Sequence, residues 1–182
     1  RRGVPYIKVP TTLLAVVDAS VGVKTSINHF NRRNRLGTYY APCVSLLDTQ
    51  FFVTLPCREI YSAMGEIIKI AVIKNLSLFK VLEINAKDLI SSKFGHKSSS
   101  EVIETSIHDM ILELESNLWE KNLKRCVDFG HSFSPLLEMR SLKNKNVNDL
   151  THGEAVSLDV IFSCCLSVYK NLMDYSELLR VV

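Results

Sequence analysis

Several patterns that would each indicate a class of protein are absent from the sequence. No run of about 18 apolar residues exists, so no segment is expected to span a membrane. The five cysteines form no Cys-x-x-Cys pair and their number is odd, which argues against a disulfide framework or a thiolate zinc site. Internal repeats, low-complexity segments and nucleic-acid-binding motifs are also missing. These absences favour a reduced, cytoplasmic protein with no membrane or nucleic-acid partner.

Positive charge is concentrated near the N-terminus. Residues 1–35 hold seven Lys or Arg residues and a single acidic residue, Asp18, whereas the whole chain has a net charge of only +3. A basic segment of this kind suits a small molecule that carries phosphate, a nucleic acid or a solvated face. Because no nucleic-acid motif accompanies it, a phosphate-bearing small molecule is the preferred interpretation.

The length and the ends of the chain limit what it can form. Its 182 residues, 47% of them hydrophobic, suffice for one sizeable core or for one small domain and part of another. The chain begins with Arg1 and ends at Val182, soon after a new helix start at Asp174. We therefore expect a piece of a longer protein, for which a missing signal peptide carries no information.

The pattern of apolar residues changes near Pro56. Before it, short alternating segments predict strands or hairpin arms over residues 4–9, 18–28, 32–40 and 44–47. After it, a helical period predicts helices over residues 58–83, 101–123 and 154–172, with a polar connection over 85–100. We expect Trp119 to pack and the last helix to be buried on most faces. The change predicts an α/β or β-rich region followed by an all-helical domain.

His131 stands at a predicted junction of two elements. It follows Gly130, where we predict the end of a strand or extended segment, and precedes a helix that begins near Pro135, a residue suited to a first helical turn. Taken alone, this position suits either a helix-capping histidine without chemistry or a ligand.

A second histidine, His152, changes that balance. Thr151 and Glu154 have the spacing of a capping box, so His152 is predicted to open the last helix. Two histidines at two helix starts can converge on one metal ion. Because a catalytic zinc site uses three protein ligands and one open position, a carboxylate from elsewhere in the chain is required.

Glu66 and Lys69 lie three residues apart, on one face of the predicted helix over residues 58–83, among apolar neighbours. An unpaired charge there would be costly. The pair is therefore either a buried structural ion pair or a metal ligand beside a catalytic lysine.

Several separated motifs together resemble the dehydroquinate synthase superfamily of sugar phosphate cyclases. They occur in the family's order over nearly the whole chain: Val9-Pro10-Thr11-Thr12-Leu13-Leu14, Asp18-x-Ser20-Val21-Gly22-x-Lys24-Thr25, Asn34, Gly65-Glu66-Ile67-Ile68-Lys69, Gly130-His131-Ser132-Phe133 and His152-Gly153-Glu154. The resemblance implies an α/β plus all-α fold. Residues 1–56 would be the end of a dinucleotide-binding α/β domain, and residues 57–182 a helical domain that binds metal and substrate. A homodimer is also implied.

The resemblance implies a role for particular residues. The metal, Zn²⁺ or Co²⁺, would be held by Glu66, His131 and His152. NAD would be contacted by Thr11, Thr12, Lys24, Arg33, Phe51, Phe52, Val53 and Thr54, with Arg33 standing where the family often has a lysine. Site positions on the substrate side would be Asp18, Lys24, Asn34, Lys69 and Asp128.

One departure from the family pattern bears on the substrate. Dehydroquinate synthases carry a second histidine four residues after the metal histidine, and this chain has Pro135 there. Proline at this position resembles the branch that cyclises sedoheptulose 7-phosphate. Within that branch, Asp128 and Leu114 resemble 2-epi-5-epi-valiolone synthases rather than desmethyl-4-deoxygadusol synthases. Those synthases, a 3-dehydroquinate synthase and an inactive fragment are the alternatives.

Overall fold

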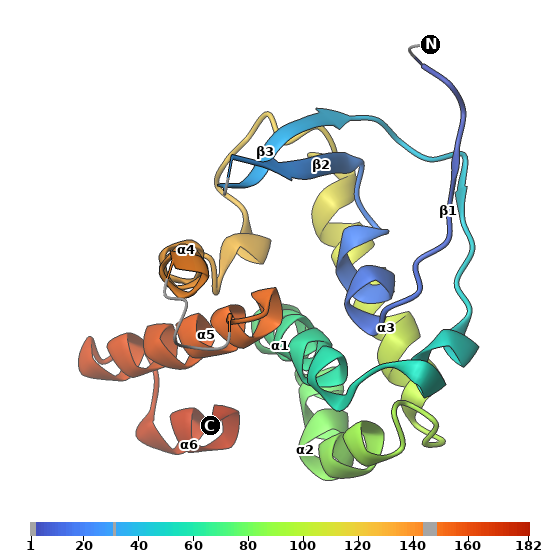
Figure 1. Ribbon diagram of the computed structural model, residues 1–182. Coiled ribbons are helices and arrows are strands. Elements are labelled where there is room, and N and C mark those ends of the chain that lie inside the picture. The colour runs from blue at the N-terminus through green and yellow to red at the C-terminus, as the bar shows by residue number, and fades with distance from the viewer. Residues whose placement is uncertain (1–2, 31, 144–148) are drawn as a thin grey trace.

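The computed structural model describes residues 3–30, 32–143 and 149–182, and the side chains at 32, 33, 142 and 143 also lie outside the description. Within these ranges the chain forms short strands first and helices afterwards (Figure 1). The strands are β1 (Ile7–Lys8), β2 (Lys24–His29), β3 (Arg32–Tyr39) and β4 (Val44–Ser45). The α-helices are α1 (Cys57–Lys74), α2 (Leu76–Ser91), α3 (Ser99–Glu115), α4 (Ser134–Lys143), α5 (His152–Tyr169) and α6 (Tyr175–Val181).

Two small sheets are formed. β1 pairs in parallel with β4, so that Ile7 lies beside Val44. β2 and β3 form an antiparallel hairpin with an irregularity between Ile27 and His29. The hairpin extends across the top of the molecule in Figure 1, between α3 and α4. The predicted hairpin is therefore confirmed, whereas the two flanking strands are much shorter than predicted.

Three short helical turns complete the chain. A π-helix over Ala15–Ala19 follows β1, a 3-10 helix over Thr49–Thr54 precedes α1, and a 3-10 turn over Cys126–Asp128 precedes α4. We predicted a strand or extended segment before Gly130, and that prediction is wrong. Arg125 and Asp128 form an ion pair at a spacing of three residues, which fits a 3-10 turn and not an extended chain.

α1 is the centre of the helical core. Ile60, Ala63, Ile67 and Ile70 on this helix are fully or almost fully buried, and α2, α3 and α5 all pack against it. Burial of a side chain of this size stabilises the fold by roughly 1.5–3 kcal/mol each. The core therefore fixes the orientation of the α1 residues that face α5.

The predicted helix over residues 58–83 is interrupted at Asn75. This residue is extended (φ −143°, ψ 94°), and its side-chain oxygen accepts a hydrogen bond from the Leu78 amide at 3.0 Å, which caps α2. The side-chain nitrogen of Asn75 donates a hydrogen bond to Asp109 Oδ2 on α3 at 2.7 Å. The polar connection predicted over residues 85–100 is also wrong, because α2 continues to Ser91 and buries Leu89.

Three further expectations need correction. α3 ends at Glu115 rather than at residue 123. Trp119 lies beyond the end of α3 and is 51% exposed. α5 is not buried on most faces, because Leu158 and Phe162 stay about half exposed in the described chain. No helix in the described part of the chain has both the length and the apolar character needed to cross a bilayer.

Candidate metal centre and cleft

Two glycines let α1 and α5 approach closely where they cross. A Cβ atom at Gly65 would lie 2.3 Å from the carbonyl oxygen of Gly153, and one at Gly153 would lie 1.6 Å from that of Ser62. Neither position has room for a side chain. Because Glu66 follows Gly65 and His152 precedes Gly153, this crossing brings the carboxylate and the imidazole together.

The cap of α5 fixes the second of these side chains. Thr151 accepts a hydrogen bond from the Glu154 amide, and Glu154 accepts one from the Thr151 amide at 2.8 Å, so the predicted capping box is confirmed. Arg58 on α1 donates to Glu154 at 2.8 Å and ties this end of α5 to α1. His152 is thereby the first residue of a helix whose N-terminus is fixed by its own capping box and by Arg58 of α1.

A buried aspartate on α5 holds the turn that carries His131. Asp159 is fully buried, and its Oδ2 accepts hydrogen bonds from the amides of Phe133 and Ser134, at 2.5 and 2.8 Å. These are the unpaired donors at the start of α4, which a carboxylate stabilises. The sequence did not lead us to Asp159, although an aspartate among apolar residues of a helix was the available signal.

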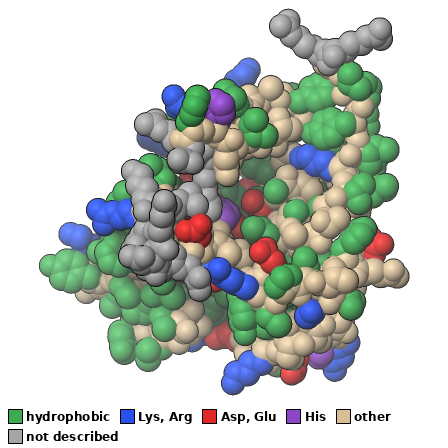
Figure 2. All heavy atoms as spheres, in the orientation of Figure 1, with side chains coloured by type: hydrophobic (Ala, Val, Ile, Leu, Met, Phe, Trp, Pro, Cys, Tyr) green, Lys and Arg blue, Asp and Glu red, His purple; other side chains and the backbone are tan. Residues whose placement is uncertain are grey.

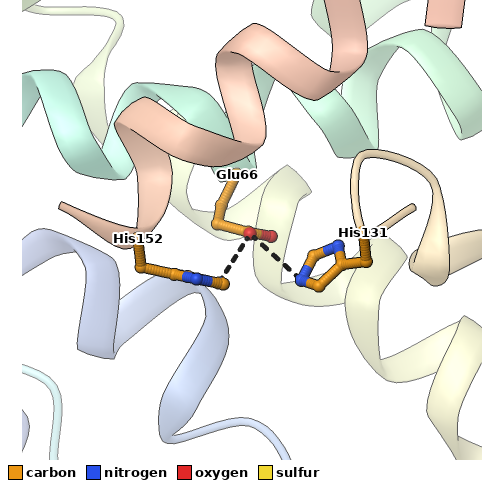
Figure 3. A group of neighbouring side chains, drawn as sticks. All are labelled: Glu66, His131 and His152. Carbon is orange, nitrogen blue, oxygen red and sulfur yellow. Dashed lines mark ion pairs between the residues drawn. The ribbon is translucent and has the colours of Figure 1, made fainter. Parts of the chain in front are cut away.

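Glu66, His131 and His152 therefore converge from three separate segments (Figure 3). His152 Nε2 lies 3.3 Å from Glu66 Oε1, and His131 Nε2 lies 4.0 Å from the same atom. One ligand atom from each residue lies within 4.8 Å of the other two. The Glu66 side chain is only 1% exposed, whereas the two imidazoles are about 30% exposed. The cluster is therefore closed on the α1 side and open on the other.

The chemistry of this cluster fits a divalent metal ion. Both carboxylate oxygens of Glu66 are buried without a well-formed hydrogen bond, although Lys69 Nζ lies 2.5 Å from Oε2. Lys69 supplies one compensating charge to this buried carboxylate, which stays ionised and is therefore able to act as a ligand. Two histidines and one carboxylate are a donor set that zinc accepts, with an open position for substrate.

The outer nitrogen of each imidazole is also engaged. His131 Nδ1 lies 3.2 Å from the Phe129 carbonyl oxygen, to which it can only donate. His152 Nδ1 lies 2.7 Å from Oε1 of Glu138, a buried residue of α4. With Nδ1 held in this way, both Nε2 atoms face Glu66, as is typical of metal-binding histidines. Glu138 was not predicted from the sequence, because its spacing from His152 says nothing about contact.

The same contacts shift the acidity of the cluster. Burial would raise the pKa of Glu66, but the neighbouring His152 and Lys69 together lower this pKa to about 2. The hydrogen bond to Glu138, followed by that to Glu66, raises the pKa of His152 to about 10. The pKa of Asp18 is raised, first by burial and then by the charge of Glu66. A metal ion bound to His152 Nε2 must therefore displace a proton.

Replacing Glu138 with Gln should weaken metal binding. The amide would be a poorer acceptor for the His152 Nδ1 proton, and losing such an outer partner typically costs about 10–100-fold in affinity. Zinc competition against a chelator should show this loss. Glu83→Gln is the matched control, because Glu83 pairs with Arg180 away from the cleft. Equal zinc affinity in the Glu138 and Glu83 variants would contradict the role of Glu138.

The cluster lies at one side of a polar cleft of about 990 Å³. In Figure 2, acidic side chains and a histidine are visible in the hollow of this face, below the hairpin. The cleft is lined by Pro135 and by seven predicted site residues, namely Asp18, Lys24, Asn34, Lys69, Asp128, His131 and His152. Four charged lining residues were missed from the sequence: Arg35, Glu120, Arg125 and Glu138.

The residues predicted to contact NAD do not gather at this cleft, apart from Lys24. Thr12 caps the π-helix, where its Oγ1 accepts from the Ala15 amide at 3.1 Å, and Thr11 beside it is exposed. Phe52 is 1% exposed in the core, so a contact from this residue to a cofactor would have to come from its backbone. Its neighbours Phe51, Val53 and Thr54 are exposed. Arg33 belongs to β3, but its side chain lies outside the described residues.

Comparison with known proteins adds independent information. The family model described as 3-dehydroquinate synthase N-terminal matches residues 1–62, and the one described as 3-dehydroquinate synthase C-terminal matches residues 63–182. A 2-epi-5-epi-valiolone synthase from Streptomyces albus is 44% identical over 187 residues, which cover 100% of this chain and 44% of that protein. The chain thus spans less than half the length of this relative.

Solved structures are similar over the whole chain. One is a 2-epi-5-epi-valiolone synthase from Streptomyces hygroscopicus subsp. jinggangensis 5008 with NAD⁺ and Zn²⁺ bound, with a TM-score of 0.92 and 39% identity over 100% of this chain and 49% of that one. Another is a 2-deoxy-scyllo-inosose synthase complexed with carbaglucose-6-phosphate, NAD⁺ and Co²⁺, with a TM-score of 0.79 and 25% identity over 99% of this chain and 47% of that one.

Proposed function

The chain belongs to the 3-dehydroquinate synthase family, and we propose that it is part of a sugar phosphate cyclase that converts sedoheptulose 7-phosphate to 2-epi-5-epi-valiolone with loss of phosphate. The reaction would use NAD and Zn²⁺ or Co²⁺. The observation that carries this proposal is the convergence of Glu66, His131 and His152 on a polar cleft that also contains Pro135. The similarity to synthases of this product supports it.

We propose that Glu66, His131 and His152 hold the metal ion, and that a bound NAD would supply reversible hydride transfer. The bound metal would acidify a substrate hydroxyl and polarise the carbonyl that forms from it. Lys69 Nζ lies beside Glu66 in a buried position, where it can stabilise negative charge that develops on a substrate oxygen. The basic side chains Lys24 and Arg125 line the same cleft and suit the phosphate group before it leaves.

Pro135 is the basis for the choice of substrate. It lines the cleft four residues after His131, and its side chain can neither donate a hydrogen bond nor carry charge. A substrate with a carboxylate would lose a polar partner there, at a cost on the order of 1–3 kcal/mol or more for a charged group. Sedoheptulose 7-phosphate has no carboxylate to accommodate.

The remaining parts of the proposal concern organisation. We propose that residues 1–56 complete a dinucleotide-binding domain and that residues 57–182 form the helical metal and substrate domain. The rest of the NAD site would come from parts of the protein beyond this chain, which is consistent with its share of the relatives' length. We also propose a cytoplasmic homodimer. Thr11, Thr12, Arg33 and the exposed residues around Phe51 remain proposed NAD contacts.

The whole protein, supplied with NAD and zinc or cobalt, should cyclise sedoheptulose 7-phosphate and leave the carboxylate-bearing precursor of dehydroquinate unchanged. Mass spectrometry and NMR of the product would identify the valiolone skeleton. An ultraviolet-absorbing product would indicate the deoxygadusol branch instead, and release of dehydroquinate would contradict the argument from Pro135. Absence of turnover with every substrate would favour a non-catalytic protein.

A further inference from the structure

Glu120 interacts with side chains from three separate segments at the edge of the cleft. Its side chain is only 8% exposed, and both Lys24 of β2 and Arg125 form ion pairs with its Oε1. Tyr39 of β3 donates a hydrogen bond to its Oε2 at 3.2 Å. Both strands of the hairpin are thereby joined to one carboxylate that lies outside the hairpin.

The loop that carries Glu120 is held by its own hydrogen bonds. The Glu120 amide donates to the Asn117 carbonyl at 2.8 Å, and its backbone is left-handed, with φ at 51°. The Asn117 side chain bonds both backbone groups of Asn122, at 2.6 and 3.1 Å, and so closes the loop. The position of Glu120 is therefore set by the segment that follows α3 and does not depend on the hairpin.

Among the residues that the structure describes, the hairpin has few other connections to the helical part of the chain. β2 and β3 pack mainly against each other. Among the described residues, the side-chain hydrogen bonds and ion pairs from these strands to the helical part are those of Lys24 and Tyr39 with Glu120. The same hairpin brings Lys24, Asn34 and Arg35 to the cleft. The position of these groups relative to the rest of the cleft thus depends on the contacts with Glu120.

We propose that Glu120 is a positioning residue that fixes the β2–β3 hairpin over the cleft and aims Lys24 and Arg125 at the phosphate of the substrate. The part that concerns the phosphate rests on the function proposed above. The carboxylate remains ionised near neutral pH, because Lys24 and Arg125 lower its pKa although burial alone would raise it. Its charge in turn raises the pKa of Tyr39.

A positioning role and a simple neutralising role predict opposite effects. Arg125 also bonds Asp128, with Nε 3.0 Å from Oδ2, so two cations and two carboxylates form a neutral group. If Glu120 only cancelled positive charge, removing its charge would leave the cleft more basic and would strengthen the binding of phosphate. If Glu120 positions the cations and the hairpin, removing its charge weakens that binding.

Hydrogen exchange without substrate tests the hairpin directly. In Glu120→Gln we expect amides of residues 24–39 to exchange roughly tenfold faster than in the wild type, because hydrogen bonds to a charged group are lost. Tyr39→Phe removes one bond and no charge, and should give a smaller increase in the same segment. Glu113→Gln is the control, since it removes a carboxylate that pairs with Lys74 of α1. Unchanged exchange in both hairpin-contact variants overturns the proposal.

Steady-state kinetics of the whole protein provides the second readout. In Glu120→Gln we expect KM for sedoheptulose 7-phosphate to rise about tenfold, with a smaller fall in kcat and an unchanged zinc content. A lower KM would show that Glu120 only neutralises charge, and would overturn the proposal. Failure of the wild type to act on this substrate would count against the function proposed above, while the exchange result would still decide the role of Glu120 in holding the hairpin.

Discussion

Replacing Gly153 with Ala is expected to destabilise the protein strongly and to remove its metal. The new Cβ atom would lie 1.6 Å from the Ser62 carbonyl oxygen, which belongs to the backbone of α1 and cannot rotate away. The two helices would have to separate, and overpacking of this kind costs about 1–3 kcal/mol, occasionally more. For a domain of this size we expect the melting temperature to fall by roughly 2–12 °C.

The effect on the metal follows from the same displacement. Separation of α1 and α5 would move His152 away from Glu66. In the structure, His152 Nε2 lies 3.3 Å from Glu66 Oε1. Thermal unfolding and zinc analysis of the same samples would measure both effects. Gly22→Ala is the matched control, because the nearest atom to its new Cβ is a side-chain methyl of Leu114 at an ordinary 3.8 Å. A Gly153 variant as stable and as zinc-loaded as the Gly22 variant would contradict the helix-crossing argument.

The second prediction with a large expected effect distinguishes the residues that bind the metal from the residue that stabilises charge on the substrate. His152→Ala removes one of three expected ligands and should abolish zinc retention and activity together, and His131→Ala should do the same. Lys69→Met should leave zinc content near normal, because Glu66, His131 and His152 remain. Its turnover should nevertheless fall by about 10²–10³-fold if Lys69 stabilises charge in the transition state.

Elemental analysis and turnover of the three variants would check this pattern. Normal zinc content in both histidine variants would show that the ligand assignment is wrong. A normal rate in Lys69→Met would reduce Lys69 to a structural partner of Glu66. His96→Ala serves as the control for loss of a histidine, since His96 lies in the connection between α2 and α3 and does not line the cleft.

Local sequence signals predicted much of the candidate centre. The capping box at Thr151 correctly placed His152 at the start of a helix, and the spacing of Glu66 and Lys69 correctly placed them on one helix face. Both are properties of a few neighbouring residues. The resemblance to a family then supplied the combination of Glu66 with the two histidines, which the structure brings within reach of one ion.

Contacts between distant segments could not be predicted in this way. The approach of Gly65 to Gly153 depends on how α1 and α5 cross, and neither glycine has a side chain that would indicate it. Glu138 was recognisable as a charged residue of a helix, but not as the partner of His152. The burial of the Phe52 side chain could not be predicted either, because it depends on the elements that pack around this residue.

The break at Asn75 had a local signal that was overlooked. Asparagine is among the preferred N-cap residues, and it stands in an otherwise helical pattern. The pattern continued on both sides, so the two helices were predicted as one. The exposed face of α5 was misjudged for a different reason. An apolar sequence predicts that a helix can be buried, but it does not show how much of the helix surface other segments of the chain cover.

Crystallographic location of the metal tests the central claim most directly. Crystals of the zinc-loaded protein, measured on both sides of the zinc absorption edge, should give an anomalous difference peak between Glu66, His131 and His152. We expect it about 2.0–2.2 Å from one carboxylate oxygen and from both Nε2 atoms. A zinc peak elsewhere, or a fully loaded protein in which any of the three side chains points away from the ion, would contradict the account.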